Sequence, residues 1–386
     1  MKYPSLAFIA LIIVFWAAGC AGLPVSGTIA GQPIDTRVDS EVARYYLANY
    51  LTGHRSNPLF DGKIANAYER MRDSLPDRAE LKRLSEEFSV DFAAAYLAEQ
   101  INRQSENRRF RDLFLENRRA FSQNRLKLTS GAADYEVLFV PTYLYKRLPI
   151  VGSDLAVPKK AMQKIGLPVY FVETVEDGAV ETNAEIVVAA LAERASSGRR
   201  LIVISASKSG PEVALALTQL GPLKTRHVVG WINAVGALQG TPLADERVLT
   251  DIEDLVGKVD VAGMESLMTE RSRRRFQKFQ VPEHILVVNY FGIPLSGNLS
   301  SWARRGFAPL SKYGPNDGIL LLADMIFPAA ITVVELGLDH FLLDRNIDAA
   351  TVGLVTAVMR WYEESARRAL QTSTPLHTAQ KDQRQP

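Results

Sequence analysis

Six short apolar segments between residues 135 and 336 constrain the fold of this chain more than any other feature. Helical patterns at Asn183–Glu193, Glu212–Leu220 and Ala349–Leu370 follow the second, third and sixth of them. Short apolar strands that alternate with helices predict a mostly parallel sheet, covered on both faces and joined by right-handed crossovers. The segments are Glu136–Val140, Val169–Glu173, Leu201–Ser205, Val228–Asn233, Ile285–Phe291 and Ile331–Leu336.

Ser207 lies directly after the third segment, in a turn that leads into a helical pattern. It is the central residue of Ser205-Ala206-Ser207-Lys208-Ser209, and Gly210 follows. A serine between small residues at this place is typical of a nucleophile elbow, a tight strand-to-helix turn that exposes the hydroxyl. Here serines occupy the two flanking positions where glycines are usual. The alternative is a strand that ends in an ordinary polar turn.

His340 is the candidate base for Ser207, because it alone among the five histidines follows a predicted strand. Functional groups of a parallel sheet gather beyond the carboxyl ends of its strands, which is where Ser207 lies. The other histidines precede strands or fall outside the alternating region: His54, His227, His284 and His377. The alternative for His340 is a structural histidine in a loop.

Asp317 is the candidate acid that would orient His340 and stabilise its protonated ring. It stands in an Asn-Asp-Gly turn beyond the Ile285–Phe291 segment. Two other carboxylates lie nearby in sequence. Asp339 is the direct neighbour of His340 and is expected to point away from it, and Glu335 falls inside a predicted strand.

From residue 135 to 362 the sequence resembles the α/β-hydrolases of the lipase and esterase type. The Ser–Asp–His chain order of the three candidates is that of this family. Residues 314–318 resemble the Asn-Asp-Gly acid loop of bacterial triacylglycerol lipases, and the histidine follows the aspartate by 23 positions, a similar interval. Residues 240–245 resemble the Gly-Thr-Pro segment beside the lipase active site. Residues 140–143, Val-Pro-Thr-Tyr, replace the His-Gly pair of many lipases.

The resemblance implies an α/β-hydrolase fold and a serine esterase or lipase that works without metal or cofactor. Ser207 would attack an ester carbonyl, His340 would accept its proton, and Asp317 would hold the imidazolium. One oxyanion donor would be the backbone N–H of Lys208. The second would be that of Thr142 or Tyr143, since the proline before them has none.

Two insertions, at about residues 243–284 and 292–313, interrupt the alternation of strands and helices and are expected to cap the site. Apolar residues in both favour an ester substrate with an apolar acyl group, although the same residues could simply pack the caps onto the core. The four arginines between residues 271 and 275 predict a solvated face: Arg271, Arg273, Arg274 and Arg275.

The N-terminus predicts export. Lys2 precedes an apolar run of 13 residues from Leu6 to Ala18, which is short for a spanning helix. The following Cys20 is the one cysteine of the chain, and Ala17–Cys20 resembles the lipobox of bacterial lipoproteins. This resemblance implies a signal peptide over residues 1–19 and a lipidated Cys20 that anchors the protein in the bacterial cell envelope, with the outer membrane favoured. The alternatives are a plain secretory signal and an uncleaved anchor.

The rest of the chain divides into four parts. Residues 20–33 predict a lipidated tether, 34–130 an all-helical region, 131–370 the catalytic domain, and 371–386 a disordered tail.

Basic residues between 103 and 127 are interpreted as a solvated, ion-paired helix face rather than a membrane-facing one. A net charge of +2 and the lack of a nucleic-acid-binding motif argue against a nucleic-acid partner.

Two other classes of function remain open from the sequence. The same triad could serve a thioesterase, a polyester depolymerase or an acyltransferase. Alternatively, the protein could be a non-catalytic binding protein of the cell envelope, with the helical region as its working part.

Overall fold

The computed structural model describes residues 22–71, 75–246, 259–343 and 346–373. The predicted signal peptide, Cys20, residues 247–258 of the first cap insertion and residues 374–386 of the predicted tail lie outside these ranges. No helix in the described ranges is both long and apolar enough to cross a bilayer.

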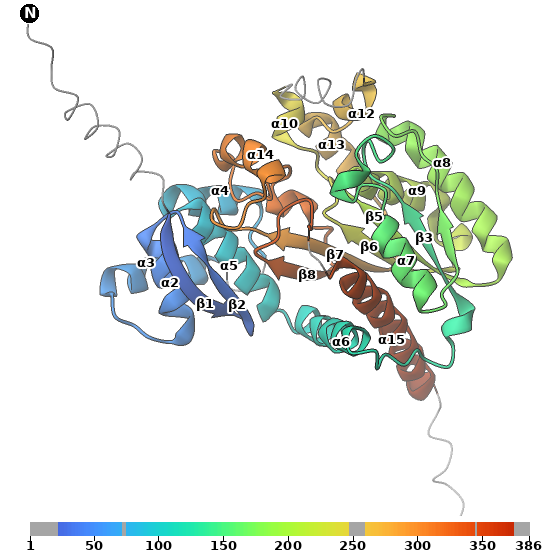
Figure 1. The fold of residues 1–386 in the computed structure, drawn as a ribbon, viewed down its shortest axis with the longest axis horizontal. Coiled ribbons are helices and arrows are strands. Elements are labelled where there is room, and N and C mark those ends of the chain that lie inside the picture. Colours follow the sequence, from blue (N-terminus) through green and yellow to red (C-terminus); the bar gives the residue numbers. More distant parts are fainter. Residues whose placement is uncertain (1–21, 72–74, 247–258, 344–345, 374–386) are drawn as a thin grey trace, which may run out of the picture.

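A six-stranded parallel sheet forms the centre of the molecule, in the order β4-β3-β5-β6-β7-β8 (Figure 1). All six predicted strands are present, which confirms the α/β architecture. Their bounds are β3 (Tyr135–Val140), β4 (Val169–Phe171), β5 (Arg200–Ala206), β6 (Val228–Ala234), β7 (Leu286–Ile293) and β8 (Ile331–Leu336).

Helices cover both faces of this sheet. The helices α8 (Val180–Arg194) and α9 (Ser209–Lys224) pack on one face, and α7 (Ala156–Lys164) and α15 (Ile347–Ser373) pack on the other. Alternate residues of β5 serve the two layers, as the period of two in a strand requires. Val203 belongs to the buried cluster that contains Leu217 of α9, whereas Ile204 belongs to the cluster that contains Val355 of α15.

The N-terminal region begins with a β-hairpin, so the prediction of a tether over residues 20–33 and of an all-helical region after it was wrong at this point. The hairpin consists of β1 (Leu23–Ile29) and β2 (Gln32–Val38), and Ala30 and Gly31 form its turn with positive φ angles of 49° and 82°. Val25, Ile29, Ile34 and Val38 are buried. The helix at Glu41–Ala48, directly after the hairpin, packs on it, and the helix at Val90–Arg103 also contacts β1. Both lie outside residues 20–33, so the composition of that segment alone does not reveal them.

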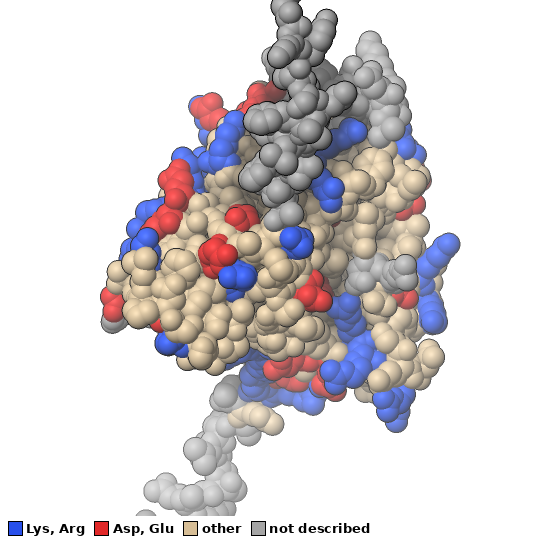
Figure 2. All heavy atoms as spheres, turned by 60° about the vertical axis from the view of Figure 1, so that its left-hand side comes forward, with Lys and Arg blue, Asp and Glu red and all other residues tan. Residues whose placement is uncertain are grey.

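Five helices follow the hairpin, in agreement with the helical prediction for this part. They are α2 (Glu41–Ala48), α3 (Pro58–Arg70), α4 (Arg78–Glu87), α5 (Val90–Arg103) and α6 (Ser105–Ser122). Acidic and basic side chains are interspersed on the face shown in Figure 2, which carries this region. Several arginines of α6 make ion pairs with the rest of the protein, for example Arg118 with Glu335 of β8 and Arg109 with Glu364 of α15, both at 2.5 Å.

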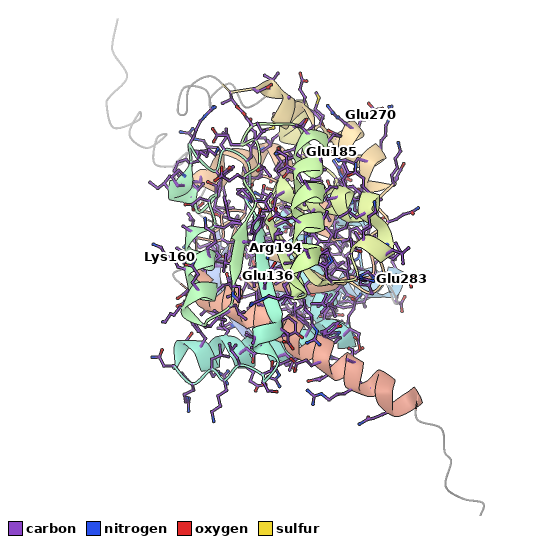
Figure 3. The ribbon with its side chains drawn as sticks, turned by 90° about the vertical axis from the view of Figure 1, so that its right-hand side faces the viewer. Glu136, Lys160, Glu185, Arg194, Glu270 and Glu283 are labelled. Carbon is purple, nitrogen blue, oxygen red and sulfur yellow. The ribbon has the colours of Figure 1, made fainter. Side chains whose placement is uncertain are left out.

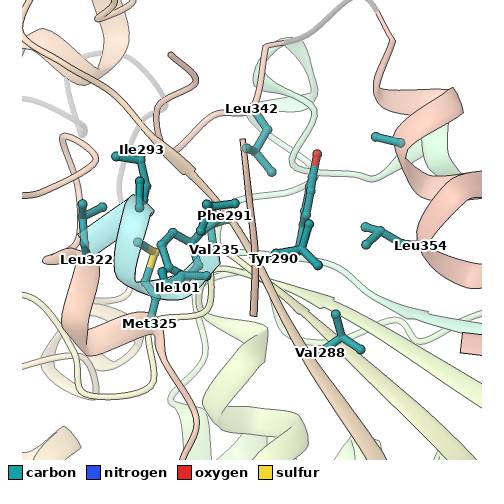
Figure 4. Packing of buried hydrophobic residues seen from close by; sticks show 14 of the residues in the cluster. Ile101, Val235, Val288, Tyr290, Phe291, Ile293, Leu322, Met325, Leu342 and Leu354 are labelled. Carbon is teal, nitrogen blue, oxygen red and sulfur yellow. The ribbon is translucent and has the colours of Figure 1, made fainter. Parts of the chain in front are cut away.

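The helical region and the sheet share one hydrophobic core. Ile101 of α5 lies in the same cluster as Phe291 of β7 and Leu354 of α15 (Figure 4). Phe114 of α6 makes an edge-on contact with the Tyr290 ring, with 6.1 Å between the ring centroids. A Cβ at Gly353 of α15 would lie 2.9 Å from the carbonyl oxygen of Phe114, so a glycine is needed where these two helices meet.

The two insertions lie beyond the carboxyl ends of the strands (Figure 1). The first carries α10 (Pro242–Asp245), α12 (Val261–Glu265) and α13 (Thr269–Phe276), and the second carries α14 (Ser301–Ser311). The predicted solvated face on α13 was wrong for Arg275. This side chain is buried, and it donates hydrogen bonds to Glu181 Oε1 (2.8 Å) and to the Ser266 carbonyl (2.9 Å).

Short 3₁₀ helices occupy several of the connections between the longer elements. They are η2 (Tyr50–Thr52), η3 (Ala132–Asp134), η4 (Pro149–Val151), η5 (Ala195–Ser197) and η6 (Leu322–Met325).

The shared core leads to a prediction about stability. We expect Phe114→Ala to lower the free energy of unfolding by about 3–5 kcal/mol, because it opens a cavity between α6, β7 and α15. Urea denaturation of residues 21–386 measures this change. Leu59→Ala is the control, since Leu59 is 65% exposed and its loss should change the free energy by about 0.5 kcal/mol or less. Equal effects of the two substitutions would contradict a shared core.

Candidate active site

Ser207 occupies a strained turn between β5 and α9. Its φ angle of 54° is in the left-handed region, which residues other than glycine seldom adopt. Backbone hydrogen bonds on both sides hold this conformation. The Ser207 N–H donates to the Ala234 carbonyl, and the Ser207 carbonyl accepts from the Ala237 N–H, each at 2.9 Å. Strain that the surrounding structure enforces in this way is typical of functional positions.

The two serines that replace the flanking glycines are buried, and each hydroxyl is hydrogen-bonded. Ser205 Oγ accepts from Trp231 Nε1 at 2.8 Å. Ser209 Oγ accepts from the Ala206 N–H and donates to the Val140 carbonyl, each at 2.8 Å. The close approach in this turn falls instead on Gly210, where a Cβ would lie 2.6 Å from Asn233 Oδ1. The elbow therefore forms without glycines at its usual positions.

The structure brings Ser207, Asp317 and His340 together in one hydrogen-bonded relay. His340 Nε2 lies 3.0 Å from Ser207 Oγ, and His340 Nδ1 lies 2.8 Å from Asp317 Oδ2. Asp317 is fully buried, and its Oδ1 accepts from the N–H groups of Ile319 (2.9 Å) and Leu320 (2.7 Å). The other oxygen therefore faces the histidine, which fixes its orientation.

The rival residues are engaged elsewhere. Asp339 accepts hydrogen bonds from the N–H groups of Ser300 (2.8 Å) and Phe341 (3.1 Å), and Glu335 pairs with Arg118. His284 Nε2 contacts the Thr225 carbonyl at 3.0 Å, and burial lowers the pKa of His227. His54 is exposed on the N-terminal region, and His377 lies outside the described residues.

The three backbone N–H groups predicted as oxyanion donors differ in whether they already donate a hydrogen bond within the protein. The Thr142 N–H donates to the Ser153 carbonyl at 3.4 Å. Within the described ranges, the N–H groups of Tyr143 and Lys208 donate to no protein acceptor. Tyr143 follows β3, whose last residue pairs with Ser205 in the sheet, and α12 packs against its ring. Tyr143 and Lys208 therefore offer the free donors near the elbow.

A buried polar cluster beneath the elbow was missed by sequence reasoning. The Lys208 ammonium pairs with Glu212 Oε1, and Asn183 Nδ2 donates to the same oxygen at 2.9 Å. Burial raises the pKa of the Glu212 carboxyl, and the Lys208 charge opposes this rise. The i, i+4 spacing of Lys208 and Glu212 at the start of a helix was the available signal. It did not reveal that both side chains are buried.

Two aromatic rings lie next to the relay on its His340 side. The Phe341 ring contacts His340 edge-on at 5.7 Å and lies 6.2 Å from the Trp302 ring of α14. Trp302 and Leu343 are 38% and 50% exposed.

A separate cavity of about 210 Å³ lies between the hairpin and the ends of β7 and β8, with Ile34 and Leu295 among its walls.

The N-terminal region contacts the loops that carry the site. The Arg78 guanidinium of α4 lies 3.1 Å from Asp324 Oδ2, just beyond the Asp317 turn. A Cβ at Gly314 would lie 3.5 Å from the backbone nitrogen of Lys82, so α4 also runs along the start of this turn. Asp91 of α5 accepts from the Ser296 N–H at 2.9 Å. Burial, reinforced by the neighbouring Asp39, raises the pKa of Asp91 to about 7.

The Gly-Thr-Pro segment lies against the acid turn, since Thr241 Oγ1 donates to the Ile319 carbonyl at 2.5 Å. In the described ranges, no three His, Cys, Asp or Glu side chains cluster as metal ligands would. Cys20 lies outside these ranges.

Comparison with known proteins identifies the fold. The chain is similar to the metagenomic carboxyl esterase MGS0156, at 18% identity and a TM-score of 0.51, over 62% of this chain and 78% of that one. It is also similar to the mature lipase BlEst2 of Bacillus licheniformis, at 20% identity and a TM-score of 0.48, over 61% and 94%. No protein-family model and no curated protein matches the sequence. The chain has the α/β-hydrolase fold that the sequence predicted.

The buried Asp324 carboxyl leads to a prediction about pH. Burial raises its pKa from 3.8 to about 6, and Arg78 opposes this rise. The folded state therefore binds this proton more tightly than the unfolded chain. The resulting stabilisation is complete below about pH 4, is lost as the pH rises through 6, and amounts to at most about 3 kcal/mol.

We therefore expect the stability advantage of wild type over Asp324→Asn to shrink between pH 4 and pH 7. Chemical denaturation at both pH values measures it. Leu322→Ala, which changes no charge on the same turn, should lower the free energy of unfolding by the same amount at pH 4 and at pH 7. A pH-independent difference for Asp324→Asn would contradict the raised pKa.

Proposed function

We propose that this α/β-hydrolase-fold chain is a serine hydrolase that cleaves carboxylic esters through an acyl-enzyme. The observation that carries the proposal is the relay from Ser207 Oγ through His340 to Asp317, with links of 3.0 and 2.8 Å. These three residue types in this geometry form the catalytic triad of serine hydrolases.

His340 Nε2 takes the proton from Ser207 Oγ as this oxygen attacks the ester carbonyl carbon. Asp317 accepts a hydrogen bond from Nδ1–H, keeps the ring in the required tautomer and stabilises the imidazolium. Collapse of the tetrahedral intermediate breaks the C–O bond of the ester, and His340 returns the proton to the leaving alcohol. A water molecule then attacks the acyl-enzyme, with His340 again as base, and releases the acid and the free serine.

The N–H groups of Lys208 and Tyr143 stabilise the negative charge that develops on the carbonyl oxygen. Both are without a protein acceptor in the described ranges, and Lys208 stands at the N-terminus of α9, where the helix dipole favours an anion. Thr142 is the less suitable second donor, because its N–H is directed at Ser153.

The substrate is an ester with an apolar acyl group. The aromatic side chains next to the relay, Phe341 against His340 and Trp302 against Phe341, support this choice. The carboxyl esterase MGS0156, with the same fold, supports an ester rather than another acyl bond. Acyl transfer to an alcohol is the second candidate, and it would appear as a product ester when an alcohol is added.

We expect a fluorophosphonate probe to label the wild-type protein, Ser207→Ala to remove the label, and His340→Ala to reduce it strongly. The kcat for p-nitrophenyl esters, from acetate to palmitate, should fall by about 10⁴-fold or more in both variants. Ser205→Ala is the control, because its hydroxyl faces Trp231 instead of the histidine. A folded wild-type protein that neither reacts with the probe nor cleaves any ester would leave the non-catalytic binding function.

The protein is anchored in the bacterial cell envelope by lipid on Cys20, with the outer membrane favoured. The support is the lipobox-like sequence Ala17–Cys20 at the end of an apolar run. Because β1 begins at Leu23, three residues later, such an anchor would hold the hairpin within about 10 Å of the membrane surface.

We expect Cys20→Ala to move the protein from the membrane fraction to the soluble fraction, because the lipid is lost. Separation of cell fractions, followed by immunoblotting, measures the shift. Ser26→Ala on the exposed side of β1 is the control and should stay with the membrane. If Cys20→Ala also stayed there, the apolar segment would act as an uncleaved anchor.

A further inference from the structure

Lys208 and Glu212 form an ion pair that is almost completely withdrawn from solvent. The two side chains are 2% and 1% exposed, and the pair joins the residue after Ser207 to the next turn of α9. Asn183 donates to Glu212 Oε1, whereas Glu212 Oε2 has no hydrogen-bond partner among the residues that the structure describes. This cluster is outside the proton relay, so the proposed chemistry does not use its charges.

Stability does not explain this pair. Desolvating two charges costs as much as or more than their attraction returns, and apolar side chains of similar volume often serve equally well. Lys208 also places a positive charge at the positive end of the α9 dipole. A pair that is unfavourable in both respects can still fix one backbone arrangement out of several.

The cluster connects the two free N–H donors. From Lys208 it runs through Glu212 to Asn183, which exchanges hydrogen bonds with the backbone of Val175 at 3.0 and 2.9 Å. The backbone carbonyl of the next residue, Glu176, accepts a hydrogen bond from the Leu144 N–H at 3.0 Å. Leu144 follows Tyr143, so a continuous set of polar contacts spans from one oxyanion donor to the other, buried at Lys208, Glu212 and Asn183 and nearer the surface at Val175 and Glu176.

We propose that Lys208, Glu212 and Asn183 are positioning residues that fix the distance and direction between the N–H groups of Lys208 and Tyr143. This role rests on the proposed hydrolase function. The side chains do not touch the reacting atoms; they act through the backbone that carries the donors. Such fixed donors contribute most when the charge on the substrate oxygen develops in the transition state.

The test replaces both charges at once, so that neither is left buried and alone. We expect Lys208→Met combined with Glu212→Leu to lower kcat for p-nitrophenyl butyrate by about 10- to 100-fold, less than the loss of a whole donor. KM should stay near the wild-type value. The inhibition constant of a trifluoromethyl ketone, which binds as an oxyanion, should rise by the same factor.

Glu212→Gln is the single-charge comparison. It leaves the Lys208 ammonium buried without its counterion, so kcat should fall at least as far as in the double variant. The matched control is Arg194→Met with Glu136→Leu, which removes a bidentate pair near the start of β3 (Figure 3). Glu136 pairs in the sheet with Leu201, near the start of β5, whereas the elbow follows the end of β5. This control should leave kcat unchanged.

A folded double variant with wild-type kcat and inhibitor affinity would overturn the proposal. If the double variant does not fold, Asn183→Ala removes the links to Val175 and to Glu212 while both charges stay in place, and wild-type kcat in that variant would overturn the proposal as well. Labelling of Ser207 in the wild-type protein is measured first. A labelled wild type with an unaffected double variant refutes only the positioning role, whereas an unlabelled wild type refutes the hydrolase function and the positioning role together.

Discussion

The parallel register of β5, β7 and β8 is the constraint on which the site depends. Parallel strands end at the same edge, so the loops after them meet although they are far apart in sequence. In the sheet, Ser205 pairs with Val140, Ala206 with Ala234, and Ile293 with Leu336. The elbow, the acid turn and the histidine loop therefore start from one edge. From there, single hydrogen bonds complete the relay between Ser207 and Asp317.

The N-terminal region is a structural part of the unit that has the α/β-hydrolase fold. Its helices α5 and α6 complete the core at the β7–β8 side of the sheet, and α4 supports the acid turn through Arg78 and the backbone near Lys82. The hairpin contributes as well, because the Gln32 amide donates to the Val334 carbonyl at 3.3 Å and accepts from the Leu336 N–H at 3.4 Å. Through these contacts the hairpin, which is the described segment nearest the proposed anchor, packs on β8, the strand that precedes His340.

Several polar and charged side chains that the sequence pattern predicts to be exposed are buried in the folded protein. Arg275 is buried against Glu181, and Lys208 is buried against Glu212. The serines of the elbow satisfy backbone and indole groups that glycines would leave without these partners. For Arg275 and for the two serines, a partner lies on another element: Glu181, Trp231 and Val140. For Lys208 the partner is four residues away, and only the burial of both side chains depends on packing with other elements.

The sequence by itself determined the strands, the chain order of the three relay residues and the end of the sheet where they lie. These follow from short-range periodicity and from the rule that parallel strands share one carboxyl edge. Tertiary structure decided the β-hairpin at residues 23–38, the burial of Lys208 and Arg275, and the free N–H of Tyr143 in place of that of Thr142. The physical reason is that burial and hydrogen-bond satisfaction depend on which surfaces meet, and these surfaces come from residues tens to hundreds of positions apart.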